Sequence, residues 1–455
     1  MRCAIQGRSV RTVVLVDGEH YPPVVRAAIA DLRAGGLDVV GAIMLGGTEK
    51  IHASETPDFG VADVVIADGD PLEVFLTGLE KLEPELVVDL SGHPVIDARA
   101  RMRLAAHALA RGTRYQGADF RFDPPPRPRV ATKPSVAVVA TAKRTGKTAL
   151  AGHLARLLVH EDRAPVVVAM GRGGPEEPEV IEVGGDLSAE ALVALARSGR
   201  HAASDHLEDA LMARVTTIGT RRAGSGLAGG TAHSTFERGV ALANGRSESV
   251  LIFEGSGSAV PPVHADATVC AVAADADPEL VTGYFGAYVL LLSDLVVVTL
   301  ADEPLDRAAQ ALEDRIRELV PGKPIVRTTF RPHPLEPISG SHVFFATTAP
   351  PPVAATLAAH LESEHGARVV GWSTNLANRR LLTEDLQAAE GAEVLVTELK
   401  AAAVDVAAQA AMEAGMDVVF CDNRVVSLGG EGVFDEHLRV VVDLAIERFA
   451  IHGSE

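Results

Sequence analysis

Apolar runs of strand length alternate with helix-forming segments along the first quarter of the chain. The runs are apolar at nearly every position, which is typical of strands covered on both faces. Strands joined by amphipathic helices form a parallel sheet with helices on both sides. We therefore predict a Rossmann-like α/β domain over residues 1–125. Its strands are expected at 12–17, 39–45, 61–67 and 86–90, and its helices at 24–34 and 97–111.

A proline-rich segment separates this domain from the rest of the chain. Residues 123–134 contain five prolines, which favour an extended, semi-rigid connector, and we place the linker at 126–134. The alternation then resumes, and we predict a P-loop NTPase-type α/β domain over 135–340. From 341 to 455 the same pattern continues, either as a third domain or as an extension of the P-loop sheet. The predicted fold class is thus α/β throughout.

The segment Ser135–Thr148, read as S-V-A-V-V-A-T-A-K-R-T-G-K-T, has the order of a phosphate-binding loop. A strand-like apolar run precedes a polar loop that we expect to be open to solvent, and a helix-forming run follows Gly-Lys-Thr. Backbone N–H groups at the helix N-terminus favour a bound anion. Lys147 would bridge the β- and γ-phosphates of ATP, and Thr148 would place its hydroxyl on Mg²⁺. The predicted ATP-binding residues are Lys143, Arg144, Thr145, Gly146, Lys147 and Thr148.

Two features of the composition bear on the specificity of this motif. Thr141 occupies the place of the first motif glycine and restricts the turn, so a plain basic turn between a strand and a helix is the alternative. The chain has 42 Lys and Arg residues, but only seven are Lys, and Lys143 and Lys147 are two of these. In an Arg-rich chain a Lys marks a place where a compact ammonium is needed, which favours the phosphate-binding interpretation.

Acidic and imidazole side chains follow later elements of the P-loop domain. The apolar run 250–253 ends in Glu254, where a carboxylate is expected to support Mg²⁺ together with Thr148, unless it only begins a turn. His206 and Asp209 are three residues apart and can share a helix face. A metal site needs more ligands than these two, so we favour a contact with substrate or with Mg²⁺-bound water.

Two glycine-rich segments carry arginine. Arg172 stands in Gly171–Gly174 directly after a predicted strand, as a second phosphate contact or as part of a simple loop. Residues 217–234 contain five glycines and are expected to form a flexible loop that exposes backbone N–H groups. Arg221 and Arg222 in this segment can hold phosphate oxygens in bidentate fashion. A solvated linker is the alternative, but paired Arg residues in an acidic protein favour an anion.

Composition narrows the class of protein. A hydrophobic content of 47% in 455 residues excludes disorder, and the net charge of −19 argues against a nucleic-acid or anionic membrane surface. The three cysteines are far apart and form neither a zinc pattern nor a disulfide framework. No run has the length of a membrane span, and no signal peptide is apparent. We expect a cytoplasmic protein that binds small anionic molecules.

Short motifs spread over nearly the whole chain resemble, in the same order, those of the cyclic 2,3-diphosphoglycerate synthetase family. They are D-G-E-H-Y-P-P, L-G-G-T-E-K, K-R-T-G-K-T, G-T-R-R-A-G-S-G-L-A-G, F-R-P-H-P-L, F-F-A-T-T-A-P, N-L-A-N-R-R and T-E-L-K-A-A-A-V-D-V. The resemblance implies that ATP and Mg²⁺ are used to close the two phosphates of 2,3-diphosphoglycerate into an intramolecular phosphoanhydride, with release of ADP and phosphate. The resemblance does not decide the oligomeric state, and a homodimer is among the states left open.

The candidate residues fit that chemistry, because positioning and charge neutralisation are its main demands. We assign catalytic roles to Lys143, Lys147, Arg221 and Arg222. Mg²⁺ would be held by Thr148 and Glu254. Weaker candidates for substrate contacts are His206, Arg379 and Lys400.

Two other classes of function remain open at this point. One is a P-loop kinase of a phosphoglycerate-like acid, such as a 2-phosphoglycerate kinase, which would give a linear product. The other is a nucleotide-dependent switch or metallochaperone-type GTPase. A switch of that type should carry an N-K-x-D-like guanine motif after a strand, and the sequence contains none.

Overall fold

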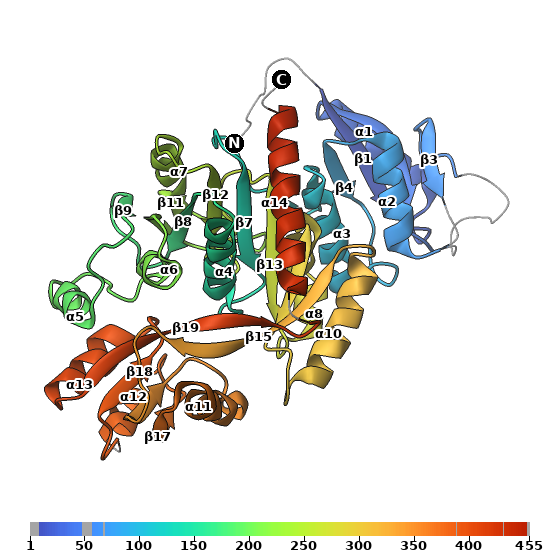
Figure 1. Cartoon of the computed structure of the whole chain (residues 1–455). Coiled ribbons are helices and arrows are strands. Elements are labelled where there is room, and N and C mark those ends of the chain that lie inside the picture. The colour runs from blue at the N-terminus through green and yellow to red at the C-terminus, as the bar shows by residue number, and fades with distance from the viewer. Residues whose placement is uncertain (1–8, 48–56, 67–68, 388, 431, 453–455) are drawn as a thin grey trace. The chain divides into compact units, whose positions relative to one another are not determined.

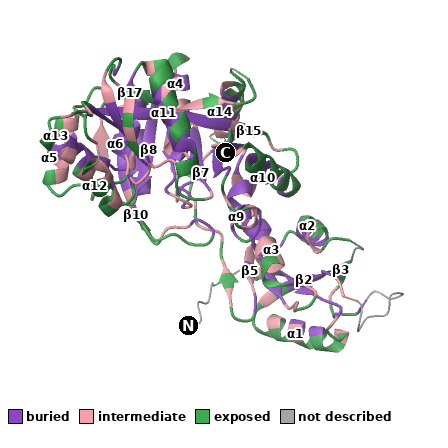
Figure 2. Ribbon diagram, turned by 90° about the horizontal axis from the view of Figure 1, so that it is seen from below, coloured by how far each residue is buried: buried purple, intermediate pink, exposed green. Residues whose placement is uncertain are grey.

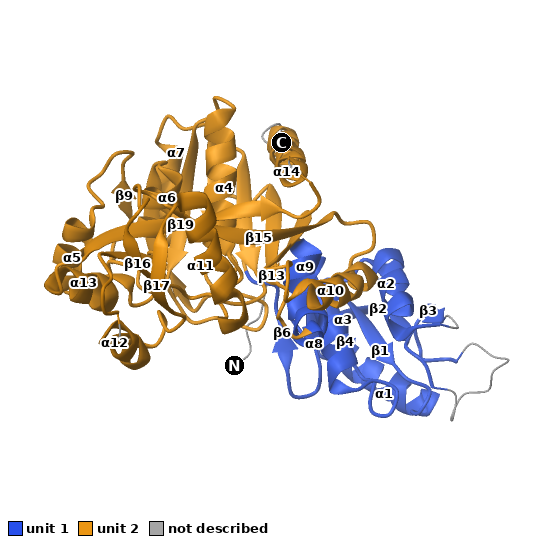
Figure 3. Cartoon of the chain, turned by 60° about the horizontal axis from the view of Figure 1, so that its bottom comes forward, with its two compact units in different colours: residues 1–125, 278–292 blue, residues 126–277, 293–455 orange. Residues whose placement is uncertain are grey.

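The computed structural model describes residues 9–47, 57–66, 69–387, 389–430 and 432–452. The chain forms two compact units, which Figure 3 colours separately. Unit 1 comprises residues 1–125 together with 278–292, and unit 2 comprises residues 126–277 and 293–455.

Unit 1 is built on a six-stranded sheet of order β3-β2-β1-β4-β5-β6. The first five strands are parallel, and only β6 runs antiparallel to its neighbour. This confirms the predicted Rossmann-like parallel sheet. The strands are β1 (Val10–Val16), β2 (Leu37–Met44), β3 (Asp63–Ile66), β4 (Leu86–Asp89), β5 (Arg114–Gln116) and β6 (Arg121–Phe122), and the helices are α1 (Pro22–Ala34), α2 (Pro71–Leu82) and α3 (Ala98–Ala110).

Two buried carboxylates organise the carboxyl edge of this sheet. Asp17, directly after β1, accepts hydrogen bonds from the Gly92 backbone N–H at 2.7 Å and pairs with His20 Nδ1 at 2.6 Å. Asp89, at the end of β4, accepts from Arg101 Nε at 2.7 Å and from the Tyr115 hydroxyl at 2.8 Å. These contacts tie the loops after β1 and β4 together, because a buried carboxylate needs donors on its oxygens.

A short helical segment from the middle of the chain also belongs to unit 1, which the sequence did not predict. It contains α8 (Pro278–Thr282) and α9 (Gly286–Leu292), and α9 packs on α3. The Phe285 ring lies 4.8 Å from the Phe122 ring, and Glu279 pairs with Arg99 at 2.6 Å. The segment is therefore an excursion of the chain from the sheet of unit 2 into the core of unit 1.

Unit 2 contains one extended sheet of order β11-β10-β8-β12-β7-β13-β14-β15-β19-β18-β16-β17, with β9 paired to β10. Its central strands are buried over their whole length, as Figure 2 shows for β7 and β8. The strands are β7 (Ser135–Ala140), β8 (Pro165–Gly171), β9 (Glu179–Ile181), β10 (Thr217–Ala223), β11 (His233–Ser234), β12 (Val250–Glu254), β13 (Ala267–Ala273), β14 (Leu295–Thr299), β15 (Ile325–Pro334), β16 (His342–Ala346), β17 (Arg368–Ser373), β18 (Val394–Thr397) and β19 (Asp417–Ser427).

Helices cover both faces of the P-loop part of this sheet. Leu154 of α4 and Leu438 of α14 share a core cluster with Val167, whereas α7 packs over the neighbouring Val168 on the opposite face. No helix among the described residues is both long and apolar enough to cross a membrane. The helices are α4 (Lys147–His160), α5 (Ala189–Arg197), α6 (Asp205–Ala213), α7 (Phe236–Asn244), α10 (Asp306–Leu319), α11 (Pro351–His365), α12 (Arg379–Gln387), the π-helical turn Ala403–Ala408, α13 (Gln409–Glu413) and α14 (Val433–His452).

Two long strands join the P-loop strands to the C-terminal strands (Figure 1). Residues 325–327 of β15 pair in parallel with β14, and residues 328–334 pair antiparallel with residues 421–427 of β19. Residues 417–420 of β19 pair in parallel with β18. Each long strand thus extends past the carboxyl end of its parallel neighbour. The carboxyl edge of the P-loop strands therefore faces the carboxyl edge of the C-terminal strands. The region from 341 onward therefore extends the P-loop sheet.

Candidate active site

The phosphate-binding loop lies between β7 and the first residue of α4, as its sequence predicts. Arg144 and Gly146 have left-handed backbone conformations, with φ of 62° and 79°. A Cβ on Gly146 would lie 2.0 Å from the Phe330 ring, so only glycine fits there. The Thr145 carbonyl accepts a hydrogen bond from the Thr299 hydroxyl at 2.9 Å, which anchors the loop to β14. The N-terminus of α4 is thereby presented to a cavity, a favourable place for an anion.

Lys147, Thr148 and Glu254 meet at the start of α4. Glu254 Oε1 accepts hydrogen bonds from Lys147 Nζ at 2.6 Å and from the Thr148 hydroxyl at 2.7 Å. The Lys147 side chain is buried, so the expectation of a solvent-open lysine is wrong: the carboxylate at the end of the neighbouring β12 holds it. Burial alone lowers the pKa of Lys147, but the carboxylates of Glu254, Asp205 and Asp209 together outweigh this and raise it above its usual range. Lys147 therefore remains charged before any phosphate arrives.

A buried acidic cluster on α6 lies beside this contact. Glu208 pairs with Lys400 Nζ at 2.9 Å, and burial nevertheless raises the pKa of Glu208 to about 8. Burial also raises the pKa of Asp209, and the adjacent Glu254 carboxylate raises it further. Lys400, which follows β18, keeps a raised pKa because Glu208 and Glu398 outweigh the effect of its burial. Its charge is therefore shared with Glu208 rather than fully available to a substrate anion.

Three cationic side chains converge beside the phosphate-binding loop. A Cβ on Gly257 would lie 2.9 Å from Arg172 Nη2, 3.3 Å from Lys143 Cγ and 3.6 Å from Arg222 Nη2. Burial lowers the pKa of Lys143, and the neighbouring Arg172 lowers it further, with Asp205 opposing. Crowded positive charges of this kind are stabilised by an anion. Lys143, Arg172 and Arg222 are called the cation cluster below.

Arg222 is the most deeply buried member of the cation cluster. It is 5% exposed, and its terminal nitrogens donate to the carbonyls of Gly224 and Ser256, both at 2.6 Å. Its Nε has no hydrogen-bond partner among the described residues. Burial, followed by the nearby Arg172, lowers the pKa of its guanidinium. An arginine held so firmly by backbone carbonyls has little conformational entropy left to lose when it binds an anion.

The prediction of a flexible glycine-rich loop is wrong for its first seven residues. Residues 217–223 form β10, which pairs in parallel with β8 and antiparallel with β9. Gly219 serves packing rather than flexibility, because a Cβ there would lie 2.5 Å from the His206 ring. Arg221 Nε donates to the Pro175 carbonyl at 2.7 Å. Arg221 and Arg222 therefore project from a strand, on opposite sides of it.

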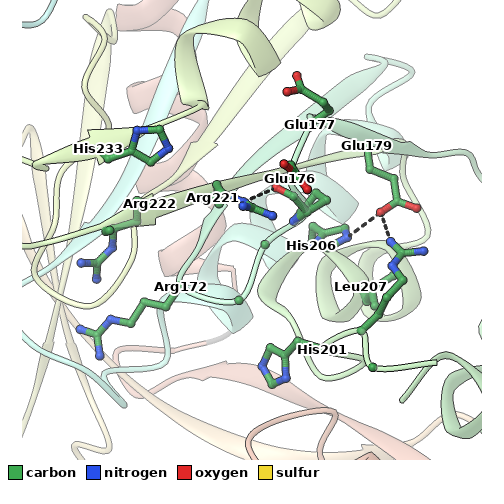
Figure 4. A pocket seen from close by; sticks show the side chains of 16 residues that line it. Arg172, Glu176, Glu177, Glu179, His201, His206, Leu207, Arg221, Arg222 and His233 are labelled. Carbon is green, nitrogen blue, oxygen red and sulfur yellow. Dashed lines mark hydrogen bonds and ion pairs between the residues drawn. The ribbon is translucent and has the colours of Figure 1, made fainter. Parts of the chain in front are cut away.

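Two cavities meet at the end of β8. One, of about 910 Å³, is lined by the phosphate-binding loop, by Phe330 and Leu357, and by the strand ends of the C-terminal region. The other, of about 830 Å³, is lined by Arg221, Arg222 and the residues labelled in Figure 4. Both are lined by Arg172, Gly173 and His201, so their contents would meet there. In Figure 4 the guanidinium groups of Arg172 and Arg222 lie on the same side of this second cavity.

Comparison with known proteins identifies the family. Sequence models of cyclic 2,3-diphosphoglycerate synthetase match the chain over the N-terminal domain (11–123), the P-loop domain (135–329) and the C-terminal domain (334–424). A protein of that name from Rubrobacter xylanophilus is 47% identical over 431 residues, which cover 93% of this chain and 96% of the relative. One from Methanothermus fervidus is 41% identical and covers 97% of this chain and 99% of its own length. The chain belongs to the cyclic 2,3-diphosphoglycerate synthetase family. The resemblance carried by the short motifs is thereby confirmed.

In this synthetase family member, some of the predicted site residues line the larger cavity and others do not. The loop residues 143–148 line the larger cavity, and so does Lys400, which follows β18. Arg379 is not brought there: it begins α12, lies outside both cavities and pairs with Asp405. Arg172 belongs to the cation cluster although the sequence left its role open. Its signal was the Gly-Arg-Gly-Gly turn after a strand. Asp205, which lines the larger cavity, gave no signal of its own.

His206 lies in the wall of the smaller cavity, but it is not a cationic contact. It is 3% exposed, and its Nδ1 lies 3.0 Å from the Ser204 hydroxyl. Burial, with help from Arg200 and His201, lowers the pKa of His206 to about 4. At neutral pH the imidazole is therefore uncharged and cannot supply the positive charge that a phosphate needs.

This pKa predicts an acid-sensitive fold. Because the pKa of His206 is about 4 in the folded state and 6.5 in the unfolded state, the unfolded chain takes up the proton first as the pH falls. The contribution to stability is complete above about pH 6.5 and declines toward pH 4, with about 2 kcal/mol lost by pH 5. Urea unfolding at pH 7 and pH 5 measures this loss. His206→Gln should show a loss smaller by about that amount, and an equal loss in both proteins would contradict the assignment.

Proposed function

We propose that the protein closes 2,3-diphosphoglycerate into cyclic 2,3-diphosphoglycerate, with conversion of ATP to ADP and phosphate. The relatives that bear the name of that synthetase match this chain over nearly their full lengths. The observation that carries the proposal is the cation cluster at the junction of the two cavities, directly beside the phosphate-binding loop. A second, highly anionic substrate beside ATP is what such a cluster suits.

The residues divide between the two substrates. The loop residues 143–148 would hold the ATP phosphates, with Lys147 leaving Glu254 to contact the β- and γ-phosphates. Arg172 and Arg222 of the cation cluster would hold the 2,3-diphosphoglycerate phosphate nearest to ATP, and Lys143 would contact both substrates. Arg221 also lines the smaller cavity and would face the remaining anionic groups of that substrate. Each contact would be a charge-assisted hydrogen bond in a partly buried site, where such bonds are strongest.

Glu254 and Thr148 also fit a magnesium ion. Glu254 is fully buried, its Oε2 accepts no hydrogen bond from an N–H or hydroxyl group of the described residues, and the Asp209 carboxyl group lies beside it, so a cation can take the place of a shared proton. The Thr148 hydroxyl lies 2.7 Å from the other oxygen of the same carboxylate. Mg²⁺ prefers a few carboxylate and hydroxyl oxygens together with phosphate and water. When bound, it would neutralise charge on the β- and γ-phosphates.

The reaction would proceed in two phosphoryl steps. An oxygen of one substrate phosphate attacks the γ-phosphorus of ATP, and the bond from that phosphorus to the bridging oxygen of ADP breaks. An oxygen of the other substrate phosphate then attacks the first substrate phosphorus and expels inorganic phosphate, which closes the ring. No strong base is required, because the attacking phosphates are already ionised near neutral pH. The chain contributes orientation and charge neutralisation.

The stoichiometry of the products tests this proposal. ADP and inorganic phosphate are measured in parallel while 2,3-diphosphoglycerate is titrated at fixed ATP. We expect both products to require 2,3-diphosphoglycerate and to appear in equal amounts. ADP formed without inorganic phosphate would indicate a kinase that stops at a linear product, and products independent of 2,3-diphosphoglycerate would indicate a nucleotide switch.

A further inference from the structure

Helix α6 carries a buried carboxyl group that receives no hydrogen bond from an N–H or hydroxyl group of the described residues. This group is Asp209, which is 1% exposed and lacks such a donor at both of its oxygens. The helix packs against α4, β8 and β10. Asp205 lies one turn earlier on the same helix face and lines the larger cavity. Asp209 therefore belongs to the face of α6 that is turned toward the phosphate-binding loop.

The neighbour of Asp209 is Glu254, at the end of β12. The two carboxyl groups lie close enough to hydrogen-bond to each other, which requires a proton on one of them. Glu254 Oε1 is occupied by Lys147 and Thr148, whereas its Oε2 has no N–H or hydroxyl donor among the described residues. Two buried carboxylates side by side repel each other unless a proton or a cation lies between them. The oxygens without donors thus mark a place for a positive ligand.

The charge of the surroundings favours a divalent cation there. Four carboxyl groups and two ammonium groups surround this place, so the acidic side chains outnumber the cationic ones. Among the described residues no three His, Cys, Asp or Glu side chains form a metal cage. Magnesium does not need one, because it is commonly held by one or two carboxylates with substrate phosphates and water. The groups counted are Asp205, Glu208, Asp209, Glu254, Lys147 and Lys400.

We propose that Asp209 completes the divalent-cation site of Thr148 and Glu254, either as a direct ligand or through one metal-bound water. The inference rests on the proposed function only in taking a metal–nucleotide complex as the occupant of the phosphate-binding loop. It assigns to α6 the task of fixing the cation against β12. The cation would then lie between the α6 carboxylate and the nucleotide phosphates, which explains why an acidic helix packs against the loop.

Manganese serves as the probe, because electron paramagnetic resonance reports free Mn²⁺ directly. The full chain is titrated with Mn²⁺ at saturating ADP, without 2,3-diphosphoglycerate, so no turnover is needed. Asp209→Asn keeps the shape of the side chain and removes its charge. We expect this variant to bind Mn²⁺ about 10- to 100-fold more weakly, as for other residues that hold a metal or orient its ligands. ADP affinity in the presence of EDTA should stay within about twofold of the parent.

Glu208→Gln is the matched control, because it removes a buried carboxylate from the next position on α6 and keeps its size. Glu208 pairs with Lys400, so its loss should change Mn²⁺ affinity by less than about threefold. Unchanged Mn²⁺ affinity in Asp209→Asn would overturn the proposal, and so would equal weakening in both variants, which would reflect only the general field. Melting temperatures test folding. If Asp209→Asn is not folded, Asp209→Glu replaces it and should weaken Mn²⁺ binding by more than about threefold, because the longer side chain displaces the carboxylate; an unchanged affinity would overturn the proposal.

The outcome is separable from that of the proposed function. A protein that binds Mn²⁺–ADP through Asp209 but makes no cyclic product would support this site and refute the synthetase activity. A protein that makes the cyclic product while Asp209→Asn binds Mn²⁺ normally would refute this site and leave the activity standing.

Discussion

Replacing Lys147 by alanine will reduce turnover by about a thousandfold or more and will also destabilise the fold. The ammonium would neutralise charge that develops on the transferred phosphoryl group, and one such contact is commonly worth about 10²- to 10³-fold or more. The same change leaves the fully buried Glu254 carboxylate without its cation. Removing one partner of a buried ion pair costs about 3 kcal/mol or more. ADP release and urea unfolding measure the two effects.

A double variant separates catalysis from stability. In Lys147→Ala/Glu254→Gln both charges of the buried ion pair are removed. Most of the free energy of unfolding that Lys147→Ala loses should therefore return, while turnover stays absent. If Lys147→Ala keeps turnover within a factor of two of the parent, Lys147 has no role in phosphate transfer. If the double variant is no more stable than the single one, the 2.6 Å contact between the two side chains does not stabilise the protein.

Removing Arg172 or Arg222 will impair the use of 2,3-diphosphoglycerate and spare the binding of ATP. Both guanidinium groups lie beside Gly257, next to the phosphate-binding loop but outside it. Each lost charge-assisted contact is worth about 1.5–3 kcal/mol, which corresponds to about 10- to 100-fold in kcat/KM per residue. Arg222→Lys should recover little, because a lysine cannot reproduce the fixed guanidinium geometry. Initial rates at varied 2,3-diphosphoglycerate and ATP binding by calorimetry provide the measurements.

Arg439→Ala is the control for these variants, since Arg439 is exposed on α14, lies outside both cavities and pairs with Glu161. Its removal should change kcat/KM by less than about twofold, as expected for a surface ion pair. Loss of ATP affinity in Arg172→Ala or Arg222→Ala, with normal use of 2,3-diphosphoglycerate, would assign the cation cluster to the nucleotide. The acidic substrate would then have to bind elsewhere.

The features predicted correctly from the sequence are those encoded locally. The strand, loop and helix around Lys147 form one continuous segment, so the order of residue types determines the phosphate-binding loop. Glu254 was found because a carboxylate directly after an apolar strand reaches the same sheet edge as the loop. The alternation of apolar runs and helices likewise predicts a parallel sheet in both units.

The features that the sequence did not predict depend on contacts between distant residues. Gly219 was taken as a sign of flexibility, but it is required because the His206 ring packs on it. Lys400 was considered a candidate for substrate contact, but it already pairs with Glu208, almost two hundred positions earlier. The antiparallel pairing of β15 with β19 is also long-range, and it alone decides that the last region extends the P-loop sheet. None of these pairings leaves a periodic signal in the chain.

Phosphorus NMR of a complete reaction tests the central claim most directly. The protein is incubated with ATP, Mg²⁺ and 2,3-diphosphoglycerate, and the spectrum is followed until ATP is consumed. The account predicts that the two phosphomonoester signals of 2,3-diphosphoglycerate disappear together, and that phosphoanhydride signals of a cyclic product appear with ADP and one equivalent of inorganic phosphate. Persistence of both monoester signals while ATP is hydrolysed, or formation of a linear phosphorylated product, would contradict it.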